Sequence, residues 1–269
     1  MTKNTGVLGC GWLGLPLAKR LIEKGYNVKG TTTSSSKLDI LRNGNISPYQ
    51  ISLSETGIQG DIDGFLSNME TLIINVPPKL RGKHTESFVE KMEFLVAEIK
   101  KSQVSNVIFV SSTAVYGNAV GEVSESSFLE PATESGKQLV ECEKMLRSDE
   151  NFKTTIIRFG GLIGPDRHPV TTLSGRQDLG NGNHPINLVH LKDCIHMILT
   201  ILEQGYWGEV FNGVYPHHPK KQVYYFEEAQ KRGLPAPAYK TESSDHKGKL
   251  VLSQNFLEKG HTFTTSIIS

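Results

Sequence analysis

The chain has 269 residues, a length that fits one large α/β domain with a small second lobe. Its 29 basic and 28 acidic residues leave a net charge of +1, which gives no electrostatic reason to expect binding to nucleic acid or to an anionic membrane. The three cysteines (Cys10, Cys142 and Cys194) are odd in number and widely spaced, and no run of about 18 apolar residues occurs. We therefore expect a cytoplasmic protein without disulfides or membrane spans, whose partner is a small molecule or another subunit.

Short β-type runs alternate with segments of helical periodicity, which is typical of βαβ units in a parallel sheet. The predicted strands are residues 7–8, 27–32, 49–53, 71–75, 106–110, 154–158, 186–189 and 210–212. The predicted helices are 13–22, 88–99, 135–147 and 191–202. The pattern predicts an α/β fold with a doubly wound parallel sheet of the Rossmann type.

Apolar periodicity is lost after Pro165, where proline, glycine, asparagine and histidine are dense up to Pro185. We interpret 166–185 as a substrate-facing loop, which forms a small substrate-binding lobe together with the polar C-terminal segment 214–269. The predicted dinucleotide-binding domain is 1–165, to which 186–213 returns.

A glycine-rich turn, Gly9-Cys10-Gly11-Trp12-Leu13-Gly14, follows the first strand and opens the first helix. This is where the dinucleotide fingerprint requires it: one glycine allows the tight turn, one lets the backbone approach the pyrophosphate, and one permits close helix packing. Helix-terminal amides then face the anion. The predicted pyrophosphate site comprises Gly9, Gly11, Trp12, Leu13 and Gly14; the alternative is a turn that only joins strand to helix.

The acid that usually binds the adenosine ribose, about 20 residues further on, is missing. The segment 30–37 carries threonines, serines and Lys37, and the first carboxylate is Asp39. Hydroxyls and a lysine can hold a 2′-phosphate that an acid would repel, so we predict NADP as the cofactor, with NAD as second choice. The predicted cofactor residues here are Thr31, Thr32, Thr33 and Lys37, with Val76 and Pro77 after the strand 71–75. The serines could instead cap the helix that begins near Lys37.

Three further segments carry a family resemblance. Residues 110–117 (VSSTAVYG) resemble the strand-end "SSxxVYG" of extended short-chain dehydrogenase/reductases, the epimerase/dehydratase group. Residues 158–165 (RFGGLIGP) resemble their "RxxxxxGP", and residues 187–193 (NLVHLKD) resemble their "FVHVxD". The compact length, the GxGxxG turn and residues 164–169 most resemble the atypical, YeeZ-like members.

The resemblance implies catalysis by a strand-end hydroxyl and a Tyr-x-x-x-Lys pair on the next helix. By register the hydroxyl is Ser112 and the lysine, which would also hold the nicotinamide ribose, is Lys137. The tyrosine position holds Thr133, whose hydroxyl is too weak an acid to titrate near neutral pH. Either another group supplies the proton or the redox chemistry is lost.

The candidate replacements for the tyrosine are Tyr116, His168 and His190. Each has a structural alternative: Tyr116 as a packing residue, His190 as a strand-end residue, and Arg167-His168 as a solvated turn. Arg167 suits an anionic substrate because its guanidinium is a fork-shaped donor. The predicted substrate-binding residues are Ser112, Thr113, Arg167, His168 and His190, and we expect no metal site.

Two functions follow from these observations. The first is an NADP-dependent oxidoreductase, epimerase or dehydratase that acts on a small polar or sugar-nucleotide-like substrate. The second is a dinucleotide-binding regulator or redox sensor without catalysis. A Rossmann domain for another nucleotide is a third alternative, and the resemblance also suggests a homodimer.

Overall fold

The computed structural model describes residues 3–78, 86–241 and 248–268. Two compact units are present, each made of separate stretches of the chain. Unit 1 consists of Met1–Ser112, Thr133–Ile157 and Met197–Val210. Unit 2 consists of Thr113–Ala132, Arg158–His196 and Phe211–Ser269.

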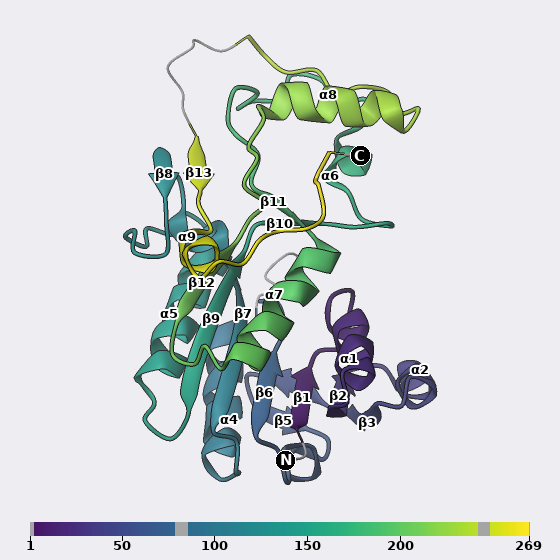
Figure 1. Ribbon diagram of the computed structural model, residues 1–269, viewed down its shortest axis with the longest axis vertical. Helices are drawn as coiled ribbons and strands as arrows, with labels where there is room; N and C mark the ends of the chain where they lie inside the picture. The colour runs from purple at the N-terminus through teal and green to yellow at the C-terminus, as the bar shows by residue number, and fades with distance from the viewer. Residues whose placement is uncertain (1–2, 79–85, 242–247, 269) are drawn as a thin grey trace. The chain divides into compact units, whose positions relative to one another are not determined.

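The main sheet of the described residues has seven strands in the order β12-β9-β7-β6-β1-β2-β3 (Figure 1). Their bounds are β1 Asn4–Leu8, β2 Asn27–Thr32, β3 Ser47–Gln50, β6 Thr71–Ile74, β7 Asn106–Ser112, β9 Lys153–Phe159 and β12 Val210–Gly213. The pairs β1–β2, β2–β3, β1–β6 and β6–β7 are parallel. The chain moves outward from β1 in one direction and then from β6 in the other, so the strand order reverses beside β1. Ligands of open parallel sheets bind at the carboxyl edge at such a switch point.

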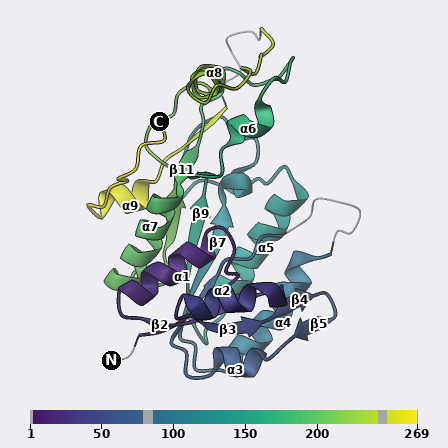
Figure 2. The same ribbon diagram turned by 90° about the vertical axis from the view of Figure 1, so that its right-hand side faces the viewer.

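Helices cover both faces of the part of the sheet that lies in unit 1. Helices α1 (Gly14–Glu23) and α2 (Leu38–Asn43) lie on one face, and α4 (Phe88–Lys100) and α5 (Glu134–Ser148) on the other (Figures 1 and 2). Helix α4 buries Met92, Leu95 and Ile99, which recur at helical spacing. All four residues of β6 are buried, as expected of a parallel strand covered on both faces. The doubly wound sheet predicted from the sequence is confirmed.

The remaining elements of unit 1 are short. They are the hairpin β4 (Ser52–Ser54) and β5 (Gly57–Gln59), the helix α3 (Ile62–Leu66), and the 3-10 turn η1 (Ser35–Lys37). Helix α7 (Leu191–Gln204) contributes its C-terminal half to this unit.

Unit 2 contains more regular structure than the sequence pattern predicts. Its small sheets pair β8 (Gly121–Val123) with β13 (Lys249–Val251), and β10 (Gly161–Ile163) with β11 (Leu188–His190). It also holds the 3-10 turn η2 (Thr113–Tyr116) and the helices α6 (Pro169–Leu173), α8 (Lys221–Lys231) and α9 (Gln254–Glu258). A separate apolar core explains this order; its buried members are Ile163, Val170, Ile186, Leu188, Tyr224, Tyr225, Ala229 and Ile267.

The boundaries of the units differ from the predicted domains, because residues 113–132, 158–165, 186–196 and 211–213 belong to unit 2. A buried polar network explains the difference. The Tyr116 hydroxyl donates to Asn212 Oδ1 at 2.8 Å and accepts from Arg158 Nη1 at 2.9 Å. The carboxylate of Glu125 accepts from the backbone N–H of Asn212 at 2.8 Å. These bonds join Arg158 in β9 and Asn212 in β12 to Tyr116 and Glu125 in the segment that follows β7.

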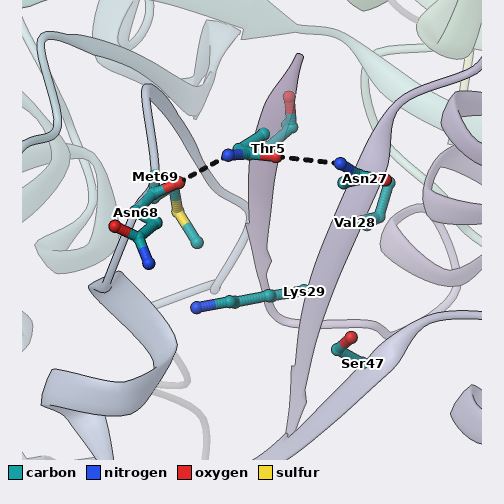
Figure 3. Close-up of a pocket in the computed structure, with 8 residues that line it drawn as sticks. Thr5, Asn27, Val28, Lys29, Ser47, Asn68 and Met69 are labelled. Carbon is teal, nitrogen blue, oxygen red and sulfur yellow. Dashed lines mark hydrogen bonds between the residues drawn. The ribbon is translucent and has the colours of Figure 1, made fainter. Parts of the chain in front are cut away.

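A pocket of about 150 Å³ lies at the amino edge of the sheet in unit 1, where β1, β2 and β3 begin (Figure 3). The side chain of Lys29 extends across it, and its ammonium donates to Gly64 O, Ser67 O and Ser67 Oγ. Those acceptors lie at the C-terminal end of α3, where a cation is favourable. All three N–H groups of Lys29 are therefore used to fix α3.

None of the helices in the described ranges is long and apolar enough to cross a membrane.

Candidate functional site

The glycine-rich turn lies at the carboxyl end of β1, beside the switch point. Gly9 has a φ of +101° and Gly14 packs so closely that an added Cβ would lie 2.1 Å from Gly9 O. An added Cβ on Gly11 would meet no atom within 4 Å, and Gly11 is exposed. The two outer glycines therefore allow the tight turn and close packing, while the middle glycine borders open space. This is the arrangement that a pyrophosphate cradle requires.

Two polar side chains hold this turn in place. Thr31 is 2% exposed, and its hydroxyl accepts from the Gly9 amide at 2.9 Å. Asn75 Nδ2 donates to Gly9 O at 3.1 Å from the end of β6. Among the described residues, the amides of Leu13 and Gly14 donate to no other backbone group. The turn is rigid and leaves donors at the start of α1 for an anion.

Thr31 was predicted to contact the cofactor, but the structure buries it beneath the turn. Thr32 is also buried, and its Oγ1 accepts from the Ser34 amide at 3.2 Å. Thr33 and Lys37 are exposed beyond β2, as a phosphate-binding role requires. Val76 and Pro77 follow β6, and Val76 Cγ1 lies 3.0 Å from the Cβ position of Gly9.

The turn after β2 contains no carboxylate. The next carboxylate along the chain, that of Asp39, is paired with an arginine. Asp39 Oδ1 accepts from Arg42 Nη1 at 2.6 Å on α2. Ser34 and Ser36 hydroxyls lie 2.8 Å apart. No serine side chain caps η1 or α2, so the capping alternative is not observed.

Ser112 ends β7 at the same edge of the sheet as the glycine turn, since β6 and β7 are parallel. The preceding residue anchors this strand end to a helix. Ser111 Oγ donates to Glu143 Oε1 at 2.6 Å, and both residues are buried. The sequence analysis did not identify Asn75, Ser111 and Glu143. The signal that could have indicated them is that each is a polar residue beside apolar positions of a predicted strand or helix.

In unit 2 the structure gives Tyr116 a packing role. Its side chain has 0% exposure, and its hydroxyl is bonded to Asn212 and Arg158. Burial raises the pKa of the phenol. These contacts argue against Tyr116 as a proton donor.

His168 is 6% exposed, so it is neither a substrate ligand in an open loop nor part of a solvated turn. Its Nδ1 accepts from the Val170 amide at 3.2 Å and caps α6. Its Nε2 lies 2.9 Å from the Tyr224 hydroxyl, which itself donates to Ile267 O at 2.8 Å. Nε2 therefore carries the proton and the ring is neutral. Burial lowers the pKa of His168 to about 4.

We expect His168 to make the protein less stable in acid. In the unfolded chain it takes up a proton as the pH falls below its usual pKa of 6.5, whereas in the folded chain it stays neutral down to about 4. Stability is thus present above pH 6.5 and is lost as the pH falls towards 4, by about 1.4 kcal/mol per pH unit. Urea unfolding at about pH 6.5 and about pH 5 should show that the wild type loses about 2 kcal/mol more than His168→Gln. Equal losses would contradict a neutral, buried His168.

The other predicted substrate residues of unit 2 fall into different environments. Arg167 is exposed and pairs with Gly164 in an isolated antiparallel β-bridge. His190 ends β11, and its Nδ1 accepts from the Lys192 amide at 3.2 Å. Thr113 is buried, and its carbonyl accepts from Lys249 Nζ at 2.7 Å. The bond at Nδ1 holds the His190 ring against the start of α7, and a substrate contact of His190 stays a prediction.

A pocket of about 630 Å³ lies within unit 2. Its walls come from residues 117–120, from the segment 184–188, and from Lys221, Tyr225 and Lys249. This volume falls in the range of pockets that enclose small organic ligands. Sequence reasoning missed Lys249, because it stands in a polar segment without a motif.

Comparison with known proteins decides the family. Residues 9–199 match the model of a family described as NAD(P)H-binding. Protein YeeZ from Escherichia coli (strain K12) is 33% identical over 251 residues, which cover 93% of this chain and 91% of YeeZ. The chain belongs to the NAD(P)H-binding family and is a relative of YeeZ.

Solved structures of sugar-nucleotide epimerases share the fold. A UDP-glucose 4-epimerase from Thermotoga maritima, solved with UDP-glucose, has a TM-score of 0.80 at 20% identity, covering 98% of this chain and 94% of the other. A UDP-glucuronic acid 4-epimerase from Bacillus cereus, solved in complex with NAD, has a TM-score of 0.80 at 16% identity, covering 98% and 92%. The YeeZ-like resemblance expected from the sequence is confirmed.

Helix α5 carries the two positions at which the resemblance places the Tyr-x-x-x-Lys pair. Thr133 is the N-cap, and its Oγ1 accepts from the Gly136 amide at 3.1 Å. Lys137 shares the exposed side with Glu141 and Lys144, at spacings of four and seven residues. The buried side carries Leu139, Glu143 and other packing residues. Lys137 is exposed on α5, and its place beside the nicotinamide ribose stays a prediction.

Proposed function

We propose that this protein binds NADP in the glycine cradle and acts as an oxidoreductase or epimerase on a sugar-nucleotide-like substrate. The observation that carries the proposal is the open space over Gly11, between two glycines that pack tightly. The bound nicotinamide would supply a hydride acceptor or donor. Ser112, at the end of β7, would orient the substrate oxygen that is oxidised or reduced.

The choice of NADP over NAD rests on the turn after β2. Thr33 and Lys37 are exposed there, and Asp39 is neutralised by Arg42. A lysine ammonium favours a 2′-phosphate, and no carboxylate of the turn repels it.

Replacing Lys37 tests this choice. Lys37→Ala should weaken NADP binding about tenfold and leave NAD binding unchanged, because a charge-assisted bond to phosphate contributes about 1.5 kcal/mol or more. Calorimetric titration measures both affinities. The matched control is Lys153→Ala, an exposed lysine at the amino end of β9. A wild type that binds NAD as tightly as NADP would rule out the 2′-phosphate assignment.

The proposed substrate class rests on the pocket in unit 2 and on the family. The pocket is large enough for a sugar nucleotide and carries two lysines that suit phosphate groups. Structures of the same fold contain UDP-glucose.

A second candidate function is a dinucleotide-binding regulator without catalysis. Thr133, at the tyrosine position of the resemblance, accepts from the Gly136 amide at 3.1 Å as the N-cap of α5, which supports a structural role for it. Purified protein with NADPH and a panel of sugar nucleotides and carbonyl compounds separates the two functions. An enzyme oxidises NADPH or interconverts a member of the panel and loses this with Ser112→Ala, whereas a regulator binds NADPH and converts nothing.

A further inference from the structure

Strand β7 extends further than its neighbour β6 at the carboxyl edge of the sheet in unit 1. Its pairing with β6 ends where Ile74 lies opposite Phe109, and residues 110–112 continue beyond that pair. Ser112, which would orient the substrate oxygen in the function proposed above, is the last residue of this extension. Because β6 ends at Ile74, the position of the extension on this side of β7 depends on side-chain contacts.

The side chains of β7 alternate between the two faces of the sheet. Phe109 lies on the face that α4 and α5 cover, because its ring stacks on that of Phe88 in α4 with the ring centroids 6.5 Å apart. Ser111 lies on the same face, and its hydroxyl donates to Glu143 Oε1 in α5 at 2.6 Å. Ser112 therefore belongs to the opposite face, the one on which α1 begins at the glycine turn (Figure 2).

Packing alone does not explain a glutamate at position 143. Glu143 is 2% exposed and lies on the buried side of α5 with Leu139 and Leu146, at helical spacing. A leucine here would bury apolar surface, whereas a carboxylate gives up its hydration and requires hydrogen-bond donors. Replacing buried ionic contacts by well-packed apolar residues often leaves stability unchanged or raises it. What the carboxylate provides is a directional bond from α5 to the end of β7.

We propose that Glu143 and Ser111 are positioning residues for the reaction. Their hydrogen bond fixes the end of β7 to α5 and thereby sets the direction in which the next residue, Ser112, presents its hydroxyl. Both side chains are buried on the face opposite Ser112, so they act through the strand and not by touching the substrate. This inference rests on the catalytic role that the proposed function gives to Ser112.

A double-mutant cycle on a panel compound that the NADP-loaded protein converts tests the proposal. We expect Ser111→Ala and Glu143→Leu each to lower kcat about tenfold, with KM and the Kd for NADP within about twofold of the wild type, because a displaced reacting group lowers the rate steeply. The double variant should lose no more than either single variant, since both remove the same bond. Glu143→Gln keeps an acceptor oxygen and should retain most of kcat. The control Ser105→Ala, just before the amino end of β7, should leave kcat unchanged. Losses that multiply in the double variant, turnover like that of the wild type, or a loss that follows the free energy of unfolding would overturn the inference.

Hydrogen exchange gives a second readout that needs no substrate. In Ser111→Ala and in Glu143→Leu, the amides of residues 110–113 should exchange at least about tenfold faster, while those of residues 106–109 stay unchanged. If the wild type converts no compound of the panel but this exchange pattern is found, the anchoring of the strand end stands and the proposed enzymatic function is wrong. Unchanged exchange at residues 110–113 overturns the inference, whether or not the protein is an active enzyme.

Discussion

Gly11→Val is expected to weaken NADP binding by at least about 100-fold while the thermal midpoint of unfolding stays close to that of the wild type. The φ of Gly11 lies outside the left-handed region, and its Cβ position meets no atom within 4 Å, so valine strains nothing in the free protein. The valine side chain would instead occupy the space over the turn that a pyrophosphate needs. A loss of 100-fold corresponds to about 2.7 kcal/mol, roughly the contribution of one or two charge-assisted hydrogen bonds.

Gly14→Ala is the matched comparison within the same turn. Its Cβ would lie 2.1 Å from Gly9 O, so we expect this variant to lose stability as well as cofactor affinity. Calorimetric titration with NADP and a thermal melt of each variant distinguish the two cases. If Gly11→Val bound NADP like the wild type, the glycine turn would not be the cofactor site.

Asp193→Ala is expected to destabilise the protein by about 3–5 kcal/mol, because it removes a buried acceptor shared by three donors. Asp193 is 1% exposed; its Oδ1 accepts from Thr264 N at 2.8 Å and Thr264 Oγ1 at 2.9 Å, and its Oδ2 accepts from Thr265 N at 3.0 Å. These bonds attach the C-terminal segment to the start of α7. Alanine would remove the acceptor of the partly buried donors of Thr264 and Thr265 and leave the segment without this anchor.

Urea unfolding measures this loss. Asp193→Asn keeps one acceptor oxygen and should lose less than the alanine variant. Asp39→Ala is the control, since its side chain is 80% exposed and its pair with Arg42 is a surface ion pair worth under about 1 kcal/mol. A loss in Asp193→Ala no larger than in Asp39→Ala would show that the C-terminal segment does not depend on this carboxylate.

Both predictions concern single positions on which a larger part of the structure depends. At Gly11 the lack of a side chain keeps the space over the turn open, and at Asp193 one carboxylate holds the C-terminal segment. Gly11 matters because the rest of the turn is already fixed by Thr31 and Asn75, so added atoms cannot be accommodated by movement. Asp193 matters because it stands in the "VHLKD" segment at the start of a helix and reaches a segment more than 70 residues away in the chain.

The sequence by itself determined the doubly wound sheet and the position of the glycine turn. Strand and helix periodicities depend on which neighbouring side chains are apolar, and glycine spacing depends on local backbone conformation, so both are visible along the chain. The expected strand 106–110 and helix 135–147 correspond to Asn106–Ser112 and Glu134–Ser148 in the structure.

Only the tertiary structure decided which polar side chains face a site. His168 and Tyr116 looked available in the sequence, yet both are buried by partners distant in the chain, Tyr224 and Asn212. Lys137 has the register of a catalytic lysine but lies on the exposed side of α5. Lys249 carries no sequence signal and lines the pocket of unit 2. Burial and direction depend on contacts between segments that are far apart in sequence, and local patterns do not contain those contacts.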